Sequence, residues 1–419
     1  MEAVKMSKNN IYPKIFILFL AFVFLLCGCS PSTPLSDPSI PSGMAPARPE
    51  DLEKHNQSHD MFSSIEDDYS TPEDSASSTV LPPESSLYEV TIPGKDLRAY
   101  LHYDGVSIWY QVLDDDYNAK YYKHTVATGK TRKLGEISDI AVVGGDTALA
   151  DNGLYIYAKT LDSTSHLLFL SFEKDEIVEV SQCDIFNLIP MDFYDGTVYS
   201  LKGYTDDPAG TETTFLDRFD PETNEETVLI SAISDTTDKL GNGLVEFDIY
   251  DANIYVYYLN ADKPGEVVAS IRVYDSDGNF QKELSLSNLP DGIKEFCTDM
   301  EVRGDYIYLY NLFSSDGIIG KIGDNEIEEV VADNYCYCAP GFIKDKMIIT
   351  ALKSSAEDTD KIYVCDVAKQ TVEEFELELE ENEYVSNILV CGDNVLLVTD
   401  NGGAETITVT ALELLTSNK

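Results

Sequence analysis

A short repeating pattern constrains the fold of this chain more than any other feature of its sequence. After Leu87, a strand-like segment, a tight turn and an aromatic or aliphatic segment recur seven times, and the last turn residues lie 41 to 56 residues apart. These turn residues are Gly105, Gly153, Gly196, Ala252, Asp305, Lys346 and Asp393. Repeats of about 40 to 50 residues with four short strands each are typical of propeller blades. The pattern therefore predicts an all-β fold, a seven-bladed β-propeller.

The two ends of the repeat indicate how the ring closes. The seventh unit ends near Leu415 after three strands, whereas Leu87–Ile92 alternates like a strand and precedes the first unit. We expect this N-terminal strand to complete the last blade, because closure removes an open sheet edge. The predicted propeller domain covers residues 86–419. A β-sandwich, or two smaller all-β domains, is the alternative fold.

Further strands are expected within the units, where apolar and β-branched residues alternate. In the first unit, the pattern predicts a third strand at 120–126 and a fourth at 131–136. The third strands expected in other units are 167–172, 268–274, 361–366 and 406–412. The Tyr residues of the second strands are expected to pack between blades rather than to form a carbohydrate platform.

The N-terminus indicates where the protein is located. Basic residues precede an apolar run from Ile15 to Cys27, and its thirteen residues are fewer than the roughly 20 that a spanning helix needs. The run ends in Leu-Cys-Gly-Cys29, which resembles the lipobox of bacterial lipoproteins. This resemblance implies a signal peptide at residues 1–28 and a lipid anchor on Cys29, on the extracytoplasmic side of the bacterial cell membrane. An ordinary secretory peptide is the alternative.

Residues 29–85 are predicted to be a disordered tether between the anchor and the propeller. Nine of the 17 prolines lie between Ser30 and Ser85, among many Ser, Thr, Asp and Glu residues and without a periodic apolar pattern. Such a composition does not form a packed core. As a flexible coil the segment would span about 40 Å.

The charge of the chain limits its partners. It has 75 acidic and 29 basic side chains, with a formal net charge of -46. Nucleic acids and anionic lipid headgroups bind surfaces rich in Lys and Arg, so this composition argues against them as electrostatic partners. A charged partner should be cationic.

The repeat also resembles a known class of domain. Units such as Tyr103-Asp104-Gly105 before VSIWY are similar to the Asp-Gly-x-x-Ile-Tyr-Tyr repeats in the extracellular propeller domains of many bacterial lipoproteins. The resemblance covers residues 87–415. It implies the propeller architecture and no particular reaction, because most domains of this type have no assigned function.

The loops between second and third strands of the blades share one face of a propeller, where ligands commonly bind. Here these loops are rich in acidic residues, which would attract cations, basic peptides or Ca²⁺. The candidate ligand-binding residues are Asp114, Asp115, Asp116, Tyr117, Tyr204, Asp206 and Asp207. Asp114 and Asp116 are the candidate metal ligands. The alternative is a solvated rim of a very acidic protein.

Other polar residues are interpreted as structural. Asp275 to Gly278 lacks the rest of an EF-hand loop, so a hairpin turn between third and fourth strands is expected there. His102, His124 and His166 fall in different strands and share no motif. The six cysteines from Cys183 onward have spacings that favour mostly buried free thiols.

These observations predict a non-catalytic binding or scaffolding module on a membrane anchor. Its partner would be a protein of the cell envelope or a cationic or metal-bridged ligand. The alternatives are an extracellular polysaccharide hydrolase or lyase, and a structural component of a cell-envelope complex. Neither a nucleophile elbow nor a zinc-binding or phosphate-binding motif occurs in the sequence.

Overall fold

The computed structural model describes residues 88–90 and, with gaps in several loops, residues 98–411. All of these residues belong to one compact unit, residues 60–419. The predicted signal peptide, Cys29 and the predicted tether lie outside the described residues. Within the described part, no helix has the length and apolar character needed to cross a membrane.

The described strands form seven antiparallel sheets, numbered here in chain order. Sheet 1 contains β2 (Arg98–Tyr103), β3 (Ser107–Leu113), β4 (Ala119–Thr125) and β5 (Lys130–Ile137). Sheet 2 contains β6 (Ile140–Ala150), β7 (Gly153–Thr160), β8 (Ser165–Ser171) and β9 (Glu176–Cys183). Sheet 3 contains β10 (Met191–Tyr194), β11 (Thr197–Thr205), β12 (Glu212–Asp220) and β13 (Glu225–Ser234).

The remaining sheets repeat this order of strands. Sheet 4 contains β14 (Gly243–Tyr250), β15 (Asn253–Lys263), β16 (Glu266–Asp275) and β17 (Phe280–Ser285). Sheet 5 contains β18 (Asp299–Arg303), β19 (Tyr306–Asn311), β20 (Asp316–Ile322) and β21 (Ile327–Asp333). Sheet 6 contains β22 (Cys336–Tyr337), β23 (Gly341–Ile343), β24 (Lys346–Leu352), β25 (Lys361–Asp366) and β26 (Thr371–Glu376). Sheet 7 contains β27 (Tyr384–Cys391), β28 (Asn394–Asp400), β29 (Glu405–Ala411) and β1 (Tyr88–Val90).

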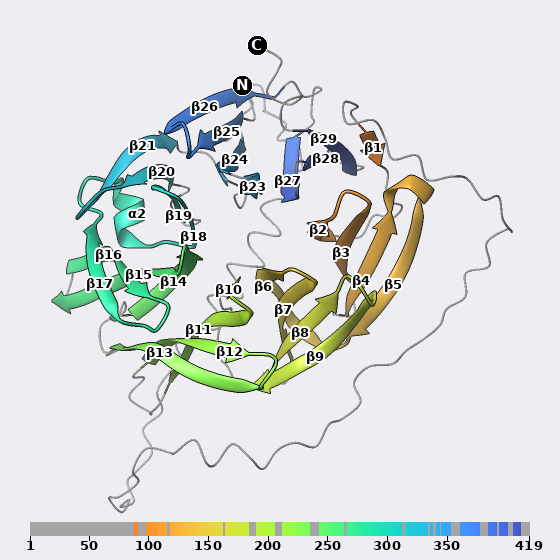
Figure 1. Cartoon of the computed structure of the whole chain (residues 1–419), viewed down its shortest axis with the longest axis horizontal. Helices are drawn as coiled ribbons and strands as arrows, with labels where there is room; N and C mark the ends of the chain where they lie inside the picture. The colour runs from red at the N-terminus through yellow and green to blue at the C-terminus, as the bar shows by residue number, and fades with distance from the viewer. Residues whose placement is uncertain are drawn as a thin grey trace, which may run out of the picture. The chain divides into compact units, whose positions relative to one another are not determined.

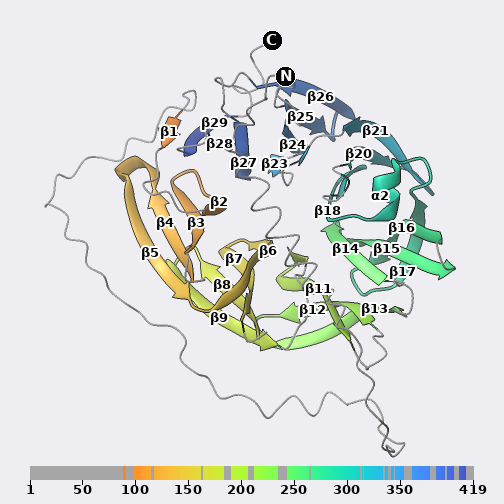
Figure 2. The same cartoon turned by 180° about the vertical axis from the view of Figure 1, so that it is seen from behind.

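The sheets follow one another in chain order around a ring, and the strand that opens each sheet lies nearest the centre (Figures 1 and 2). Consecutive sheets contact each other, and β27 of sheet 7 also contacts β2 of sheet 1. The N-terminal strand β1 pairs with β29, with Tyr88 opposite Val409 and Val90 opposite Ile407. This arrangement confirms the predicted all-β fold and its propeller character.

The hairpins form where the turn residues predicted them. In six units the predicted turn joins the first and second strands, as between β2 and β3 or between β10 and β11, and in sheet 6 it joins β23 to β24. Gly105 and Gly196 have φ values of 88° and 81°, a left-handed conformation that glycine adopts without a steric penalty. The predicted third strand 361–366 coincides with β25, and the other predicted third strands differ by one or two residues at their ends.

Aromatic and aliphatic side chains of the second strands fill the spaces between sheets. Tyr257 and Tyr308 are fully buried, and Tyr157 and Tyr199 are nearly so. One cluster joins Tyr155 of sheet 2 to residues of sheets 3 and 4. The expectation that the Tyr residues pack between blades is therefore confirmed for these positions.

Two features depart from the simple repeat. In sheet 6 two short segments, β22 and β23, both pair with β24 in place of a single first strand. A short helix, α2 (Asp291–Glu295), lies between β17 and β18, where Tyr257 Oη donates to the Ile293 carbonyl at 2.6 Å. The α2 carbonyl of Gly292 accepts a second bond, from Asn311 Nδ2 at 2.7 Å. The helix is thus tied to β15 and β19, the second strands of sheets 4 and 5.

Candidate functional site

The predicted acidic loops are described only in part. The candidates that lie outside the described residues are Asp115, Asp116, Tyr117, Asp206 and Asp207. Tyr204 belongs to β11, but its side chain is not among those described. Asp114 is the one predicted site residue whose side-chain contacts are described.

Asp114 holds the loop between β3 and β4. Its carboxylate accepts the Asn118 backbone amide at 2.8 Å and contacts the Lys120 ammonium at 2.7 Å. These bonds, led by the one from Lys120, keep the pKa of Asp114 well below its usual range. The carboxylate therefore stays ionised and is already engaged within its own turn. In the part of the chain that the structure describes, no group of three or more His, Cys, Asp or Glu side chains could hold a metal ion.

A second group of carboxylates lies on the innermost strands of sheets 3, 4 and 5. The innermost strand is a sheet edge, so some of its backbone amides have no partner within the sheet. Asp192 on β10 accepts the backbone amide of Ile249 on β14 at 3.2 Å. Asp248 on β14 accepts the backbone amide of Val302 on β18 at 2.6 Å. Each carboxylate thus reaches across to the next sheet and satisfies an edge amide there.

Burial changes the protonation of this pair. Loss of solvation raises the pKa of Asp192 to about 6, although amide bonds from Phe193 and Ile249 oppose the shift. Asp248 is 8% exposed, and burial together with the charge of Asp192 raises its pKa well above the usual value. Asp299 on β18 adds to the same repulsion. Asp192 and Asp248, here called the inner carboxylates, therefore take up protons at a higher pH than exposed carboxylates do.

The sequence contains a signal for the inner carboxylates. Asp192 and Asp248 lie four residues before the last turn residues Gly196 and Ala252, and Glu301 lies four residues before Asp305. The corresponding positions in the other units are apolar, for example Leu149 and Leu389. Three consecutive units therefore share an acidic residue at the same position of their innermost strands, β10, β14 and β18.

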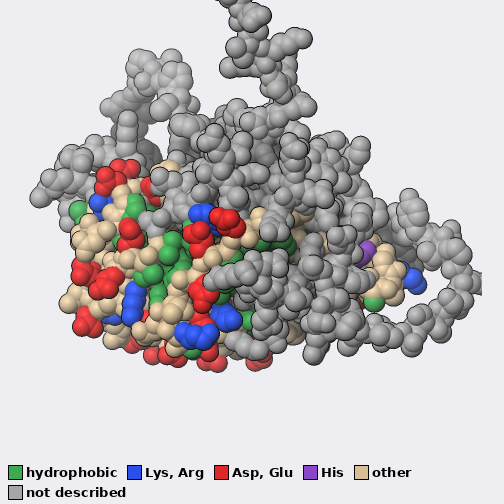
Figure 3. All heavy atoms as spheres, turned by 90° about the horizontal axis from the view of Figure 1, so that it is seen from above, with side chains coloured by type: hydrophobic (Ala, Val, Ile, Leu, Met, Phe, Trp, Pro, Cys, Tyr) green, Lys and Arg blue, Asp and Glu red, His purple; other side chains and the backbone are tan. Residues whose placement is uncertain are grey.

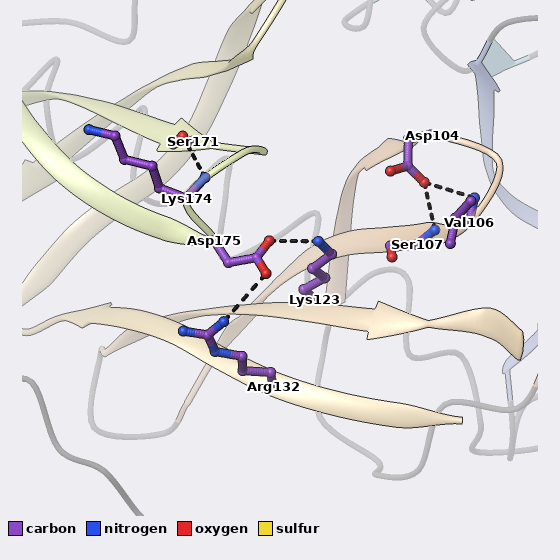
Figure 4. A network of polar contacts seen from close by, with 8 residues as sticks. All are labelled: Asp104, Val106, Ser107, Lys123, Arg132, Ser171, Lys174 and Asp175. Atoms are coloured by element: carbon purple, nitrogen blue, oxygen red, sulfur yellow. Dashed lines mark hydrogen bonds and ion pairs between the residues drawn. The ribbon is translucent and has the colours of Figure 1, made fainter. Parts of the chain in front are cut away.

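The seam between sheets 1 and 2, meaning the surface along which they pack, contains ion pairs, a cation–π contact and stacked rings. Lys123 of β4 contacts Asp175 Oδ1, in the turn between β8 and β9, at 2.6 Å, and Arg132 of β5 lies 3.4 Å from Asp175 Oδ2 (Figure 4). Lys123 Nζ also lies 4.8 Å from the ring centre of Trp109, a cation–π contact. The His102 ring stacks on Phe172 of sheet 2 at 4.3 Å.

A buried ionic cluster lies within sheet 3. Asp217 is fully buried, and its Oδ1 accepts the Ser200 hydroxyl at 2.6 Å, while Lys202 forms ion pairs with Asp217 and Glu226. Burial raises the pKa of Asp217 to about 7. The two carboxylates raise the pKa of Lys202 against the opposing effect of burial. Lys202 therefore keeps its proton and does not serve as a base for Ser200.

The histidines lie apart, as their sequence positions predicted. His102 is on β2, His124 on β4 and His166 on β8. His124 Nδ1 is 2.9 Å from Thr131 Oγ1, and His166 Nδ1 is 3.4 Å from Glu179 Oε2. Burial lowers the pKa of both His102 and His124. All three side chains contact other parts of sheets 1 and 2 and do not converge.

The turn and thiol expectations are confirmed where the structure describes them. Asp275 Oδ1 accepts the backbone amides of Asp277 and Asn279, in the hairpin between β16 and β17. Cys297 and Cys365 are buried free thiols. On the face seen in Figure 3, acidic side chains are spread over the described surface with Lys and Arg among them.

Together these features define an all-β propeller with carboxylates in part of its inner wall. No protein-family model matches the chain, and no curated protein matches its sequence. Among solved structures it is similar to an oligogalacturonate lyase from Vibrio parahaemolyticus, with 14% identity, coverage of 79% of this chain and 99% of that chain, and a TM-score of 0.50. It is also similar, with a TM-score of 0.47, 12% identity and coverage of 76% and 93%, to the β-propeller domain of the Trilobed protease from Pyrococcus furiosus. The likeness to the lyase shows a shared fold and says nothing about the reaction.

Proposed function

We propose that this protein is a bacterial lipoprotein, anchored through Cys29 on the extracytoplasmic side of the membrane, whose propeller is a non-catalytic binding module. The ligand would be cationic, either a basic segment of a cell-envelope protein or a cation-bridged group. The observation that carries the binding proposal is the charge of the chain, a net charge of -46 from 75 acidic and 29 basic side chains.

The proposal includes a seven-bladed propeller closed by its N-terminal strand. It is supported by seven sheets in the described part of the chain, by the pairing of β1 with β29, and by the contact between β27 and β2. A ring closed in this way holds its blades at fixed positions, because each blade packs between two neighbours. Such rigidity favours binding, since little conformational freedom is lost when a ligand docks.

Polar side chains in two clusters, around Ser200 and around Asp114, bind each other, which supports a non-catalytic role. Ser200 donates to Asp217 beside a protonated Lys202, and Asp114 is held by Asn118 and Lys120. A nucleophile and its general base must both reach the substrate, whereas Ser200 is buried and Asp217 is fully buried. In these two clusters the groups instead satisfy each other.

Two other functions are kept as alternatives. The similarity to an oligogalacturonate lyase makes an acidic oligosaccharide the first substrate to test if the protein is an enzyme. A structural role in a cell-envelope complex is the second. If Ca²⁺ takes part in binding, it would bind the loop that contains Asp114 and Asp116.

The test is a thermal-shift screen of the full chain in detergent with spermidine, a Lys-rich peptide, Ca²⁺ and oligogalacturonate. A ligand that binds only the native state raises the melting temperature. We expect a shift with the peptide or spermidine that decreases as salt is added. The Asp114→Asn, Asp115→Asn, Asp116→Asn variant should lower a shift caused by Ca²⁺, and Asp277→Asn, in an exposed turn, is its matched control. A shift with oligogalacturonate alone, followed by its cleavage, would favour the lyase.

A further inference from the structure

The outer strand of sheet 1 differs in charge from the other outer strands. β5 carries Lys130, Arg132 and Lys133 against the single acidic residue Glu136. The outer strands β9, β13, β21 and β26 each carry at least two acidic residues and no Lys or Arg. In β17 the charges balance, and β1 has one Glu. The β5 edge is therefore the one described outer edge with a positive excess.

The cations of β5 face solvent. The first four residues of the strand, Lys130 to Lys133, are exposed, and the Arg132 side chain is 66% exposed. Asp175, the acidic partner of Arg132, is 23% exposed and takes its shorter contact from Lys123 rather than from Arg132 (Figure 4). Glu136 pairs with Lys133 at 2.5 Å. Lys130 and Arg132 are therefore accessible to solvent and to a surface that approaches this edge.

This edge lies beside the point at which the chain enters the fold. The first described strand, β1, forms the outer edge of sheet 7, and sheet 7 contacts sheet 1 through β27 and β2. β1 and β5 lie on the same side of the ring in both views (Figures 1 and 2). A segment that leads back from β1 to a membrane anchor would therefore leave the molecule next to the β5 edge.

We propose that the β5 edge rests on the anionic phospholipid headgroups of the membrane that holds Cys29, and so fixes which side of the propeller faces outward. The proposal rests on the lipid anchor proposed above. A tether keeps the edge at an effective concentration near the millimolar range, so a few charges are enough to select an orientation. Acidic outer edges are repelled from the same surface within a Debye length of about 10 Å.

The test uses the full lipidated chain in vesicles of phosphatidylcholine, with or without about 30% phosphatidylglycerol as the source of surface charge. Exposed lysines are acetylated and counted by mass spectrometry. We expect labelling of Lys130 and Lys133 to fall about threefold on the anionic vesicles and to recover at high salt, since a Debye length of about 3 Å at 1 M screens the contact. Lys369, 71% exposed in the turn between β25 and β26, is the internal control and should label equally on both vesicles.

A variant without the β5 cations tests whether these charges cause the protection. Lys174 is 74% exposed beside this edge and reports on the same region (Figure 4). Its protection on anionic vesicles should be lost in the Lys130→Gln, Arg132→Gln, Lys133→Gln variant and kept in Lys369→Gln. A circular dichroism melt equal to that of the wild type shows that the variant is folded.

The outcomes distinguish the two proposals. If the protein does not float with either vesicle, the anchor and this orientation are both overturned. If it floats but Lys130 and Lys133 label equally on both vesicles, the orientation alone is overturned. Protection that is equal on neutral vesicles and increases with protein density would instead assign the edge to a second copy of the chain, and this also overturns the proposal.

Discussion

The seam between sheets 1 and 2 and the seams that join sheets 3, 4 and 5 meet the same packing requirement with different chemistry. The first seam uses Lys123, which forms an ion pair with Asp175 and a cation–π contact with Trp109. The others use Asp192 and Asp248, carboxylates whose pKa values are raised by burial. Sheets of one repeated architecture can therefore differ in how their contacts depend on pH.

Replacing Asp248 should have the largest effect. In Asp248→Ala the backbone amide of Val302 loses its acceptor at 2.6 Å in a buried place. We expect the free energy of unfolding to fall by about 2 to 3 kcal/mol, as for an unsatisfied buried donor. Urea denaturation followed by circular dichroism measures the change. Asp277→Ala, at an exposed turn residue, should change it by less than about 0.5 kcal/mol. Equal losses in the two variants would show that the carboxylate does not join sheets 4 and 5.

The pH dependence of Asp192 should be the next largest effect. Its native pKa of about 6 lies above the ordinary value of 3.8, so the native state binds this proton more tightly than the unfolded chain does. The resulting stabilisation is complete below about pH 4 and is lost as the pH rises through about 6. The difference in unfolding free energy between the wild type and Asp192→Asn should thus fall by about 2 to 3 kcal/mol between pH 4 and pH 7.

Asp114→Asn provides a control of opposite sign. The pKa of Asp114 is lowered, chiefly by its bond with Lys120, so its contribution is present at neutral pH and disappears as the pH falls. Denaturant titrations at five or six pH values cover both variants. If the Asp192 and Asp114 difference curves slope in the same direction, the assigned protonation states are wrong.

Lys123→Met should weaken the first seam by a smaller amount. The variant loses the 2.6 Å ion pair with Asp175 and the cation–π contact with Trp109, both partly exposed to solvent. We expect a loss of about 1 kcal/mol that shrinks in high salt. Lys174→Met, at a lysine 74% exposed and 3.6 Å from Glu176, is the matched control and should have no measurable effect. A loss that changes strongly between pH 5 and pH 7 would remove the contrast between the two kinds of seam.

The smallest effect is expected for Tyr121→Phe. Tyr121 and Tyr257 are both fully buried, but Tyr257 Oη donates to the Ile293 carbonyl, whereas the Tyr121 hydroxyl has no hydrogen-bond partner among the described residues. Tyr257→Phe should cost about 1 kcal/mol, and Tyr121→Phe should be neutral or slightly stabilising. Thermal melts compare the two. A loss in Tyr121→Phe as large as in Tyr257→Phe would indicate a hydrogen bond in solution, for example to a buried water molecule.

The local pattern of the sequence was sufficient for the hairpins. Turn residues such as Gly105 and Gly196, and the alternating strands beside them, predicted the strand pairs because both depend on neighbours in the chain. The split of the first segment of sheet 6 into β22 and β23 was not predicted, although Pro340, a residue that interrupts strands, lies between them in the sequence.

The candidate site was predicted less well. Sequence reasoning chose acidic loops such as that of Asp114 from their charge and their expected place on one face, and Asp114 proved to be bound to Asn118 and Lys120. It did not single out Asp192 or Asp248, because their roles depend on which strands meet across a seam. That information is long-range, although the shared position of these acids in successive units hinted at it.

Trp109 is the only tryptophan in the chain, and its ring is 1% exposed between sheets 1 and 2. Its emission therefore reports on one seam of the ring, whereas far-ultraviolet circular dichroism averages over every strand. If the carboxylate-linked sheets open first as the pH rises, dichroism will change while the tryptophan spectrum stays native. The native protein thus carries one optical probe, placed in the region whose contacts do not depend on the protons of the inner carboxylates.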